Sequence, residues 1–204
     1  MDTALFVRGI LIGLAIAAPV GPIGVLCIRR TLAEGRMAGL VSGLGAATAD
    51  AFYGAVAGFG LTFISTFLVS QQFWLRLIGG LFLLYLGVRT FLSVPSQSSA
   101  EGNGRGLAGM YLSTVALTLT NPLTILSFAV VFAGLGLGTG SADYVAAGLL
   151  VLGVFCGSGL WWLLLSGGVS LLRGRFSYRG LWWVNRISGI LILTFGIVAL
   201  IGML

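Results

Sequence analysis

The chain has 204 residues, of which 58% are hydrophobic and only 8% are charged, and its mean hydropathy is +1.09. An average soluble domain has about 25% charged residues. Eleven basic and five acidic residues are therefore too few to coat a soluble globule, and the composition is typical of a membrane protein. The net charge is +6 and every basic residue is arginine. In a bilayer protein such charge marks cytoplasmic loops, so no nucleic-acid partner is expected.

The sequence has no histidine and only two cysteines, Cys27 and Cys156, each inside an apolar run. It therefore lacks the usual imidazole ligand and general base. Two isolated cysteines make neither a disulfide framework nor a zinc motif. We expect no metal site, no cofactor and no catalytic residue, and interpret both thiols as small buried side chains.

Charged residues divide the first half of the sequence into apolar stretches long enough to cross a bilayer. The 20 uncharged residues between Arg8 and Arg29 suffice for one helix across about 30 Å of hydrocarbon. No basic start precedes them, so we interpret this stretch as a retained span and not as a cleaved signal peptide. A second crossing begins near Met37 and ends in a turn near residues 65–72, and a third runs over about 73–92.

The second half repeats this organisation after a polar segment rich in serine and glycine, which is typical of a loop. A fourth helix lies within residues 106–142, and the fifth and sixth occupy about 144–172 and 184–203. The sequence thus predicts an all-α membrane protein with six transmembrane helices. Its expected parts are a first three-helix repeat at 1–95, a polar linker at 96–106 and a second three-helix repeat at 107–204.

The arginines predict the orientation of the chain. Nine of them fall in or beside the connections after the first, third and fifth helices, whereas Arg8 and Arg76 fall on the opposite side. The positive-inside rule then puts the nine in the cytoplasm and both termini outside. Glycines spaced four apart, such as Gly9 and Gly13 or residues 153 and 157, predict close helix packing within the bundle or in a homodimer.

Three of the four prolines lie inside predicted helices. Pro19 and Pro22 interrupt the first span and Pro122 interrupts the fourth; Pro19 and Pro122 each lie 15 residues after the expected start of their span, near Ala4 and Leu107. Because a repeat of three helices enters the membrane in alternating directions, the two copies would form an inverted repeat. Broken helices at matching positions of such halves indicate a transporter site near the midplane. The alternative interpretation is that these prolines only bend the helices.

One carboxylate, Asp50, falls in the middle of a predicted helix. A charged residue at this depth costs about 2.5–3.5 kcal/mol on insertion scales, so it normally faces the bundle interior or a watery cavity. It could bind a substrate ammonium group, exchange a proton, or stay protonated and bonded to another helix. Thr48 and Tyr53 are expected to share its cavity.

Hydroxyl groups gather around the second break. A half-helix that begins after either break would direct free amides and its positive end toward an anion. Together with Asp50, whose carboxylate would take the amine and couple a proton, this predicts a site for a zwitterion. The expected substrate-binding residues are Pro19, Gly21, Pro22, Thr48, Asp50, Tyr53, Thr118, Thr120, Asn121, Pro122 and Thr124.

Several motifs resemble the lysine exporter (LysE/RhtB-type) family of bacterial amino-acid exporters. They are A-P-V-G-P-I-G at 18–24, E-G-R-M-A-G-L-V-S-G-L-G-A-A-T-A-D at 34–50, R-L-I-G-G-L-F-L-L-Y-L-G-V-R at 76–89, T-N-P at 120–122 and N-R-I-S-G at 185–189. The resemblance implies a bacterial inner-membrane exporter of amino acids, a bundle of two three-helix repeats and exchange against protons. It carries functional roles to Pro19, Gly21, Pro22, Asp50 and the Asn121–Pro122 break.

The solute is not identified by the sequence. The apolar spans hold a single carboxylate, which favours neutral substrates such as threonine, homoserine or leucine over basic ones. A metal-ion exporter would want several carboxylates at depth. A thiol electron carrier of the related six-helix superfamily would want a cysteine beside each break, and the fourth helix has none. Both remain alternatives.

Overall fold

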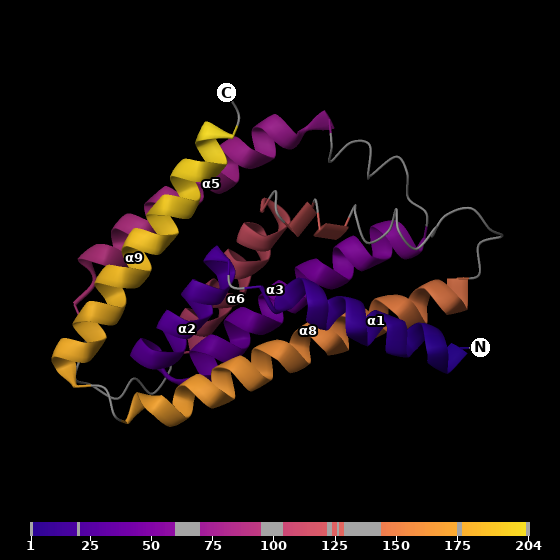
Figure 1. Cartoon of the computed structure of the whole chain (residues 1–204), viewed down its shortest axis with the longest axis horizontal. Coiled ribbons are helices and arrows are strands. Elements are labelled where there is room, and N and C mark those ends of the chain that lie inside the picture. Colours follow the sequence, from indigo (N-terminus) through magenta and orange to yellow (C-terminus); the bar gives the residue numbers. More distant parts are fainter. Residues whose placement is uncertain are drawn as a thin grey trace.

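A computed structural model describes residues 2–19, 21–59, 70–94, 104–121, 124–125, 127–128, 144–174 and 177–202. Over these residues all regular secondary structure is helical, as the apolar pattern predicts. The helices are α1 (Asp2–Ala17), α2 (Pro22–Glu34), α3 (Arg36–Gly58), α5 (Gln72–Leu92), α6 (Gly104–Leu119), α8 (Tyr144–Arg173) and α9 (Tyr178–Ile201) (Figure 1).

The first predicted span is two helices that meet at a sharp bend. The last hydrogen bond of α1 runs from the backbone amide of Ala18 to the carbonyl of Leu14. The series ends there because Pro19 has no amide hydrogen. Pro22 restarts the helix at its first position, where a missing amide costs nothing. The two helices are bent by 81° at this break. The interruption predicted from Pro19 and Pro22 is therefore confirmed.

Three described helices are long and apolar enough to cross a membrane, at Phe73–Leu92, Tyr144–Arg173 and Tyr178–Ile201, and α1 with α2 makes a fourth, bent candidate. They correspond to the predicted first, third, fifth and sixth spans. Helix α3 has 23 residues but a more polar composition, since it carries Arg36, Ser42 and Asp50. The chain is thus an all-helical, multi-pass membrane protein.

The helices form two groups that diverge from one end of the molecule (Figure 1). In one group α8 packs between α1 and α3, and α6 packs on the other side of α3; in the second group α5 and α9 form an antiparallel pair. Helix α2 contacts α3, α8 and α9 and so joins the groups. The break at residues 18–21 thereby places the start of α2 at the centre of the structure.

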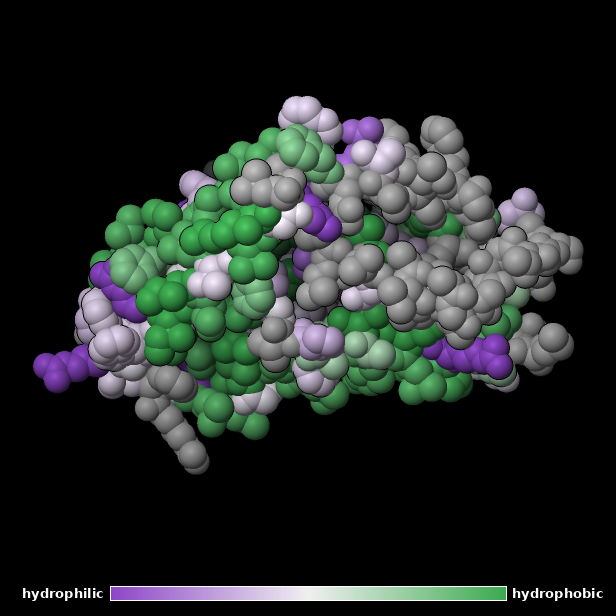
Figure 2. Space-filling model, turned by 45° about the horizontal axis from the view of Figure 1, so that its top comes forward, coloured by the Kyte–Doolittle hydropathy of each residue, from purple (hydrophilic) through white to green (hydrophobic). Residues whose placement is uncertain are grey.

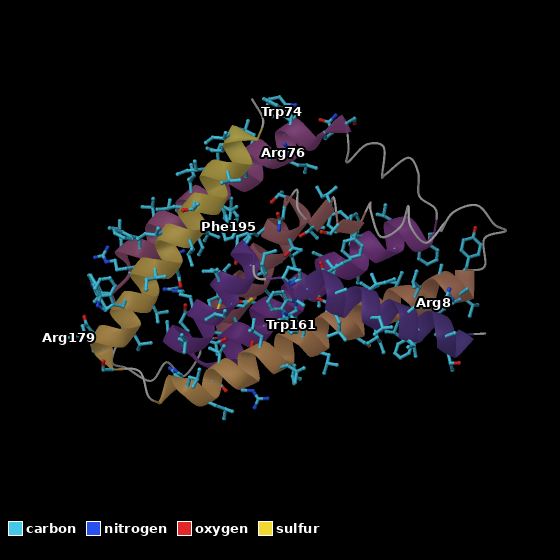
Figure 3. The ribbon with its side chains drawn as sticks, in the orientation of Figure 1. Arg8, Trp74, Arg76, Trp161, Arg179 and Phe195 are labelled. Carbon is cyan, nitrogen blue, oxygen red and sulfur yellow. The ribbon has the colours of Figure 1, made fainter. Side chains whose placement is uncertain are left out.

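Apolar side chains cover most of the described surface in Figure 2, and hydrophilic residues gather mainly toward the ends of the helices. The exposed side chains include Leu11, Ile78, Leu164 and Val198, each more than half exposed. An exposed apolar surface of this extent suits contact with lipid rather than water. Arg8 and Arg179 lie at opposite ends of the molecule (Figure 3).

A seam of glycines holds α1 against α8. Gly9 and Gly13 of α1 face Gly153 and Gly157 of α8, and a Cβ on any of the four would collide with backbone of the other helix. Small residues allow this approach in lipid, where apolar burial gives helices no advantage over acyl chains. The predicted close packing is confirmed, and these glycines meet within one chain.

Two boundaries differ from the sequence expectation. Arg29 and Arg30 belong to α2 and not to a loop, because a single residue, Gly35 with φ +104°, connects α2 to α3. Helix α9 begins at Tyr178, before the expected start near residue 184, because the Ser177 hydroxyl accepts the amide of Gly180 and caps the helix there. In both cases the apolar pattern located the span but did not include the polar residues at the end of the helix.

Gly157→Ala should destabilise the protein by about 1–3 kcal/mol, because the added methyl group forces α1 away from α8. The matched control is Gly159→Ala on the same helix, where a Cβ meets nothing within 4 Å. Thermal unfolding of both variants in detergent measures the difference. Equal melting temperatures for the two variants would contradict the seam.

Candidate functional site

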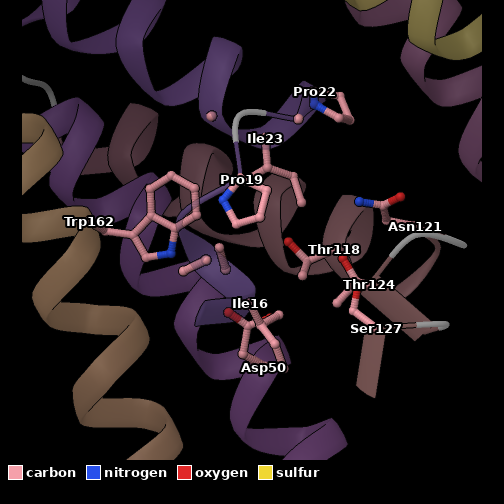
Figure 4. Close-up of a pocket in the computed structure, with 14 residues that line it drawn as sticks. Ile16, Pro19, Pro22, Ile23, Asp50, Thr118, Asn121, Thr124, Ser127 and Trp162 are labelled. Carbon is pink, nitrogen blue, oxygen red and sulfur yellow. The ribbon is translucent and has the colours of Figure 1, made fainter. Parts of the chain in front are cut away.

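A cavity of about 130 Å³ lies where the break between α1 and α2 meets α3, the end of α6 and α8. At about 30 Å³ per water molecule, as in the liquid, this space holds roughly four waters, which matches a small solute and not a peptide. Figure 4 shows Pro19 and Ile23 on one side of the cavity, Asp50 and Trp162 on others, and a group of hydroxyl and amide side chains opposite Trp162. The lining residues predicted from sequence are Pro19, Gly21, Pro22, Asp50, Thr118, Asn121 and Thr124.

Asp50 is 3% exposed and lies on α3. Its Oδ2 accepts a hydrogen bond of 2.6 Å from the hydroxyl of Ser158 on α8. The Ser158 oxygen in turn accepts a bond of 3.1 Å from Nε1 of Trp162. Since the indole can only donate, it fixes the hydroxyl hydrogen of Ser158 toward Asp50. The carboxylate is thereby held in one orientation.

No arginine pairs with Asp50 among the described residues, where the one ion pair joins Arg29 to Glu34. A buried carboxylate without a cation is costly unless it takes up a proton or a positively charged ligand. Ser158 occupies Oδ2, so Oδ1 is the oxygen that can accept such a partner. The carboxyl group of Asp50 can therefore accept either a proton or a positively charged ligand at Oδ1.

The break between α1 and α2 supplies partial positive charge, in contrast to the carboxylate of Asp50. Gly21 caps α2 without a side-chain hydrogen bond and Pro22 follows it, so the first amides of the helix belong to Ile23 and Gly24. Both residues line the cavity. Free amides and the positive end of a helix favour an anion. Thr124 adds a hydroxyl that forms no hydrogen bond with any described residue.

Four expected residues do not belong to this lining as the structure describes it. Thr48 donates to the carbonyl of Leu44 and accepts from the hydroxyl of Tyr111, because two residues along a helix turn its side chain almost to the opposite face from Asp50. Thr120 lines a separate, apolar cavity of about 230 Å³. Pro122 lies outside the described residues, although α6 does end just before it, at Leu119.

Tyr53 is the fourth expected residue that is absent from the described lining, and it has a structural role beside the cavity. Its hydroxyl donates 2.6 Å to the carbonyl oxygen of Leu119, the last residue of α6. Its ring packs on Phe128 with 5.4 Å between centroids. A helix that ends inside a bundle leaves carbonyls without partners. Tyr53 satisfies one of them and holds the end of α6 next to the cavity.

The sequence interpretation missed Ser158 and Trp162 of α8. They are four residues apart and so share one helix face. Ser158 interrupts a strongly apolar run, and that isolated hydroxyl was the available signal. The thiols also differ from expectation in part: Cys27 is buried in the core but Cys156 is exposed, and both are free. The structure does not bring them together as a redox pair.

Tyr53→Phe should lower the free energy of unfolding by about 1–3 kcal/mol, because the carbonyl of Leu119 loses its donor while staying buried. Thermal unfolding in detergent measures the loss. Tyr85→Phe is the control, since Tyr85 is 57% exposed and its hydroxyl has no partner within the described structure. If both variants melt alike, Tyr53 does not stabilise the end of α6.

Comparison with known proteins agrees with the motifs. The chain matches the LysE type translocator family over residues 14–203. It is 28% identical to the "Putative amino acid efflux protein YcgF" of Bacillus subtilis (strain 168), over 94% of this chain and 93% of that protein. It is 32% identical to the "Uncharacterized membrane protein YahN" of Escherichia coli (strain K12), over 52% of this chain and 48% of that protein. No solved structure matches it. The chain therefore belongs to the LysE type translocator family, a family of membrane transporters and not of enzymes.

Proposed function

We propose that this protein exports amino acids or close derivatives from the bacterial cytoplasm, with neutral substrates such as threonine, homoserine or leucine preferred. The observation that carries the proposal is the buried carboxylate of Asp50, which lines a cavity at a helix break and has no cationic partner among the described residues. The Bacillus subtilis relative, which is named "Putative amino acid efflux protein YcgF", supports the same substrate class.

The cavity suits a zwitterion because its two sides have opposite polarity. The substrate ammonium group binds Oδ1 of Asp50, near the carbonyl end of α1, where the negative end of that helix adds to the attraction. The substrate carboxylate binds the amides of Ile23 and Gly24 at the start of α2. Thr118 and Thr124 contact the remaining polar atoms. A second acid to hold a lysine or arginine side chain is missing from the described lining, which favours neutral substrates.

Coupling to protons follows from the same carboxylate. Asp50 holds either the substrate ammonium or a proton, since an unpaired charge at this depth is costly. Release of the amino acid outside would then be followed by protonation, and return of the proton to the cytoplasm would free the carboxylate for the next substrate. This exchange makes the protein a proton antiporter with Asp50 as the coupling group.

The proposed architecture is two inverted three-helix repeats, residues 1–95 and 107–204, in six spans. The helix contacts support it: α3 packs against α8 and α5 against α9, which pairs the second and third helices of the two halves. The contact of α1 with α8 has its counterpart in that of α6 with α3. An inverted repeat requires this reciprocal pattern.

The proposed location is the bacterial inner membrane with both termini outside. The end of the bundle formed by the start of α9 and the ends of α2 and α5 carries Arg29, Arg30, Arg89 and Arg179, whereas Arg8 lies at the opposite end (Figure 3). An excess of arginine on one side favours a cytoplasmic position for that side.

Asp50→Asn should abolish export while the protein stays folded, because the amide can neither carry the proton nor bind the ammonium ion. Transport of a radiolabelled amino acid in proteoliposomes measures this, with gel filtration as a check on folding. Thr48→Val is the control, since its hydroxyl bonds Tyr111 and Leu44 away from the cavity, and it should transport nearly normally. Wild-type transport by the Asp50 variant would remove this residue from the mechanism.

A growth screen identifies the substrate class. A sensitive host that expresses the protein should tolerate higher concentrations of neutral amino acids or their toxic analogues, and a protonophore should remove the protection. Empty vector and the Asp50→Asn variant are the controls. Protection against cadmium but against no amino acid would replace the proposal by metal-ion export.

A further inference from the structure

A second cavity, of about 570 Å³, lies between α2, α5 and α6 at the arginine-rich end of the bundle. Arg29, Arg30 and Arg89 line it together with one acid, Glu34. Its other walls include the apolar side chains of Leu26 and Leu86. None of these residues belongs to the cavity of Asp50.

Two of the three arginines have no acidic partner within the described residues. Glu34 is engaged by Arg29 at 3.2 Å. Arg30 is only 7% exposed and is held by hydrogen bonds of 2.8–3.0 Å to neutral groups of α3 and α6: Ser42, Thr114, Ser113 and the carbonyl of Met110. Arg89 is exposed and bonds no described residue. The cavity therefore carries an excess of positive charge that its own walls leave unbalanced.

Fixed guanidinium groups around a water-accessible space recognise oxyanions, because their N–H groups match the oxygens of carboxylates and phosphates. Arg30 is preorganised by its four bonds, whereas Arg89 is free to close on a ligand. Burial of Arg30 among neutral acceptors also makes an anionic ligand favourable, since it would offset an unpaired charge.

The two cavities lie along the same helices. On α2, Ile23 lines the Asp50 cavity and Arg29 the arginine cavity, about 9 Å further along at 1.5 Å per residue. One packed apolar cluster touches both: its members Ala17 and Ile23 line the first cavity, and Leu26 and Leu86 the second. The cluster thus separates two polar spaces that follow each other through the bundle.

We propose that the arginine cavity is a loading site that binds the carboxylate of the amino acid on the cytoplasmic side, before the substrate passes the apolar cluster to Asp50. This inference rests on the proposed export function. The arginines capture the carboxylate and orient the molecule, and the ammonium group then passes to Asp50 when the cluster opens.

The test uses Arg89→Gln, because Arg89 has no described contact whose loss would unfold the protein. The probe is whichever of threonine, homoserine and leucine the wild type transports fastest in proteoliposomes, together with its carboxamide. Loss of a charge-assisted bond should raise the KM for the amino acid roughly tenfold at constant kcat, measured from the side of the arginine cavity. The KM for the carboxamide, which is a cation without a carboxylate, should stay constant or fall.

The control is Arg179→Gln, which removes the same charge from an exposed position at the same end of the bundle but outside the cavity. An equal rise of KM for acid and carboxamide, or identical behaviour of the two variants, would overturn the proposal.

Repeating the assay with and without phosphatidylglycerol separates a lipid phosphate from the substrate. If the Arg89 effect needs the anionic lipid, the cavity is a lipid site and the loading role is wrong. Failure of the wild type to transport any of the three amino acids would instead refute the export function itself.

Discussion

The structure depends on how one buried carboxylate is accommodated inside a helical bundle. Asp50 lies in the middle of α3, 3% exposed, and no described cation balances it. The surrounding helices respond by fixing one oxygen through Ser158 and Trp162 and by leaving a cavity beside the other. A group in this setting gains stability by binding a proton or a cation, and this requirement underlies the proposed transport mechanism.

The helix break is the second half of the same arrangement. In an unbroken first helix the backbone amides and carbonyls would all be hydrogen-bonded to each other, and none would be available to a ligand in the cavity. The prolines instead end α1 and start α2 within a few residues, so carbonyl groups of one helix and amide groups of the other are directed toward the same space. At the end of α6, by contrast, Tyr53 donates to the carbonyl of Leu119 and satisfies it.

Close packing elsewhere supports this open centre. The glycine seam brings α1 against α8, and α8 supplies both residues that hold Asp50. At the arginine-rich end, Arg30 joins α2 to α3 and α6 through neutral acceptors. Van der Waals contact and internal hydrogen bonds therefore replace the hydrophobic effect as the source of order between helices.

The sequence alone predicted the membrane class, most of the spans, the break at Pro19 and Pro22 and the position of Asp50 in the middle of a helix, because composition, apolar run length and proline chemistry act locally. It also determined the family, through motifs spread along the chain. Which hydroxyl reaches Asp50 depends instead on how the helices pack. Thr48 lies close in sequence but faces α6, whereas Ser158, 108 residues away, reaches the carboxylate. Likewise, the sequence pattern assigns Arg30 to a loop, but the residue is buried. Partners on α3 and α6 accept the hydrogen bonds of its guanidinium group. Such contacts depend on how distant helices pack, which no local pattern contains.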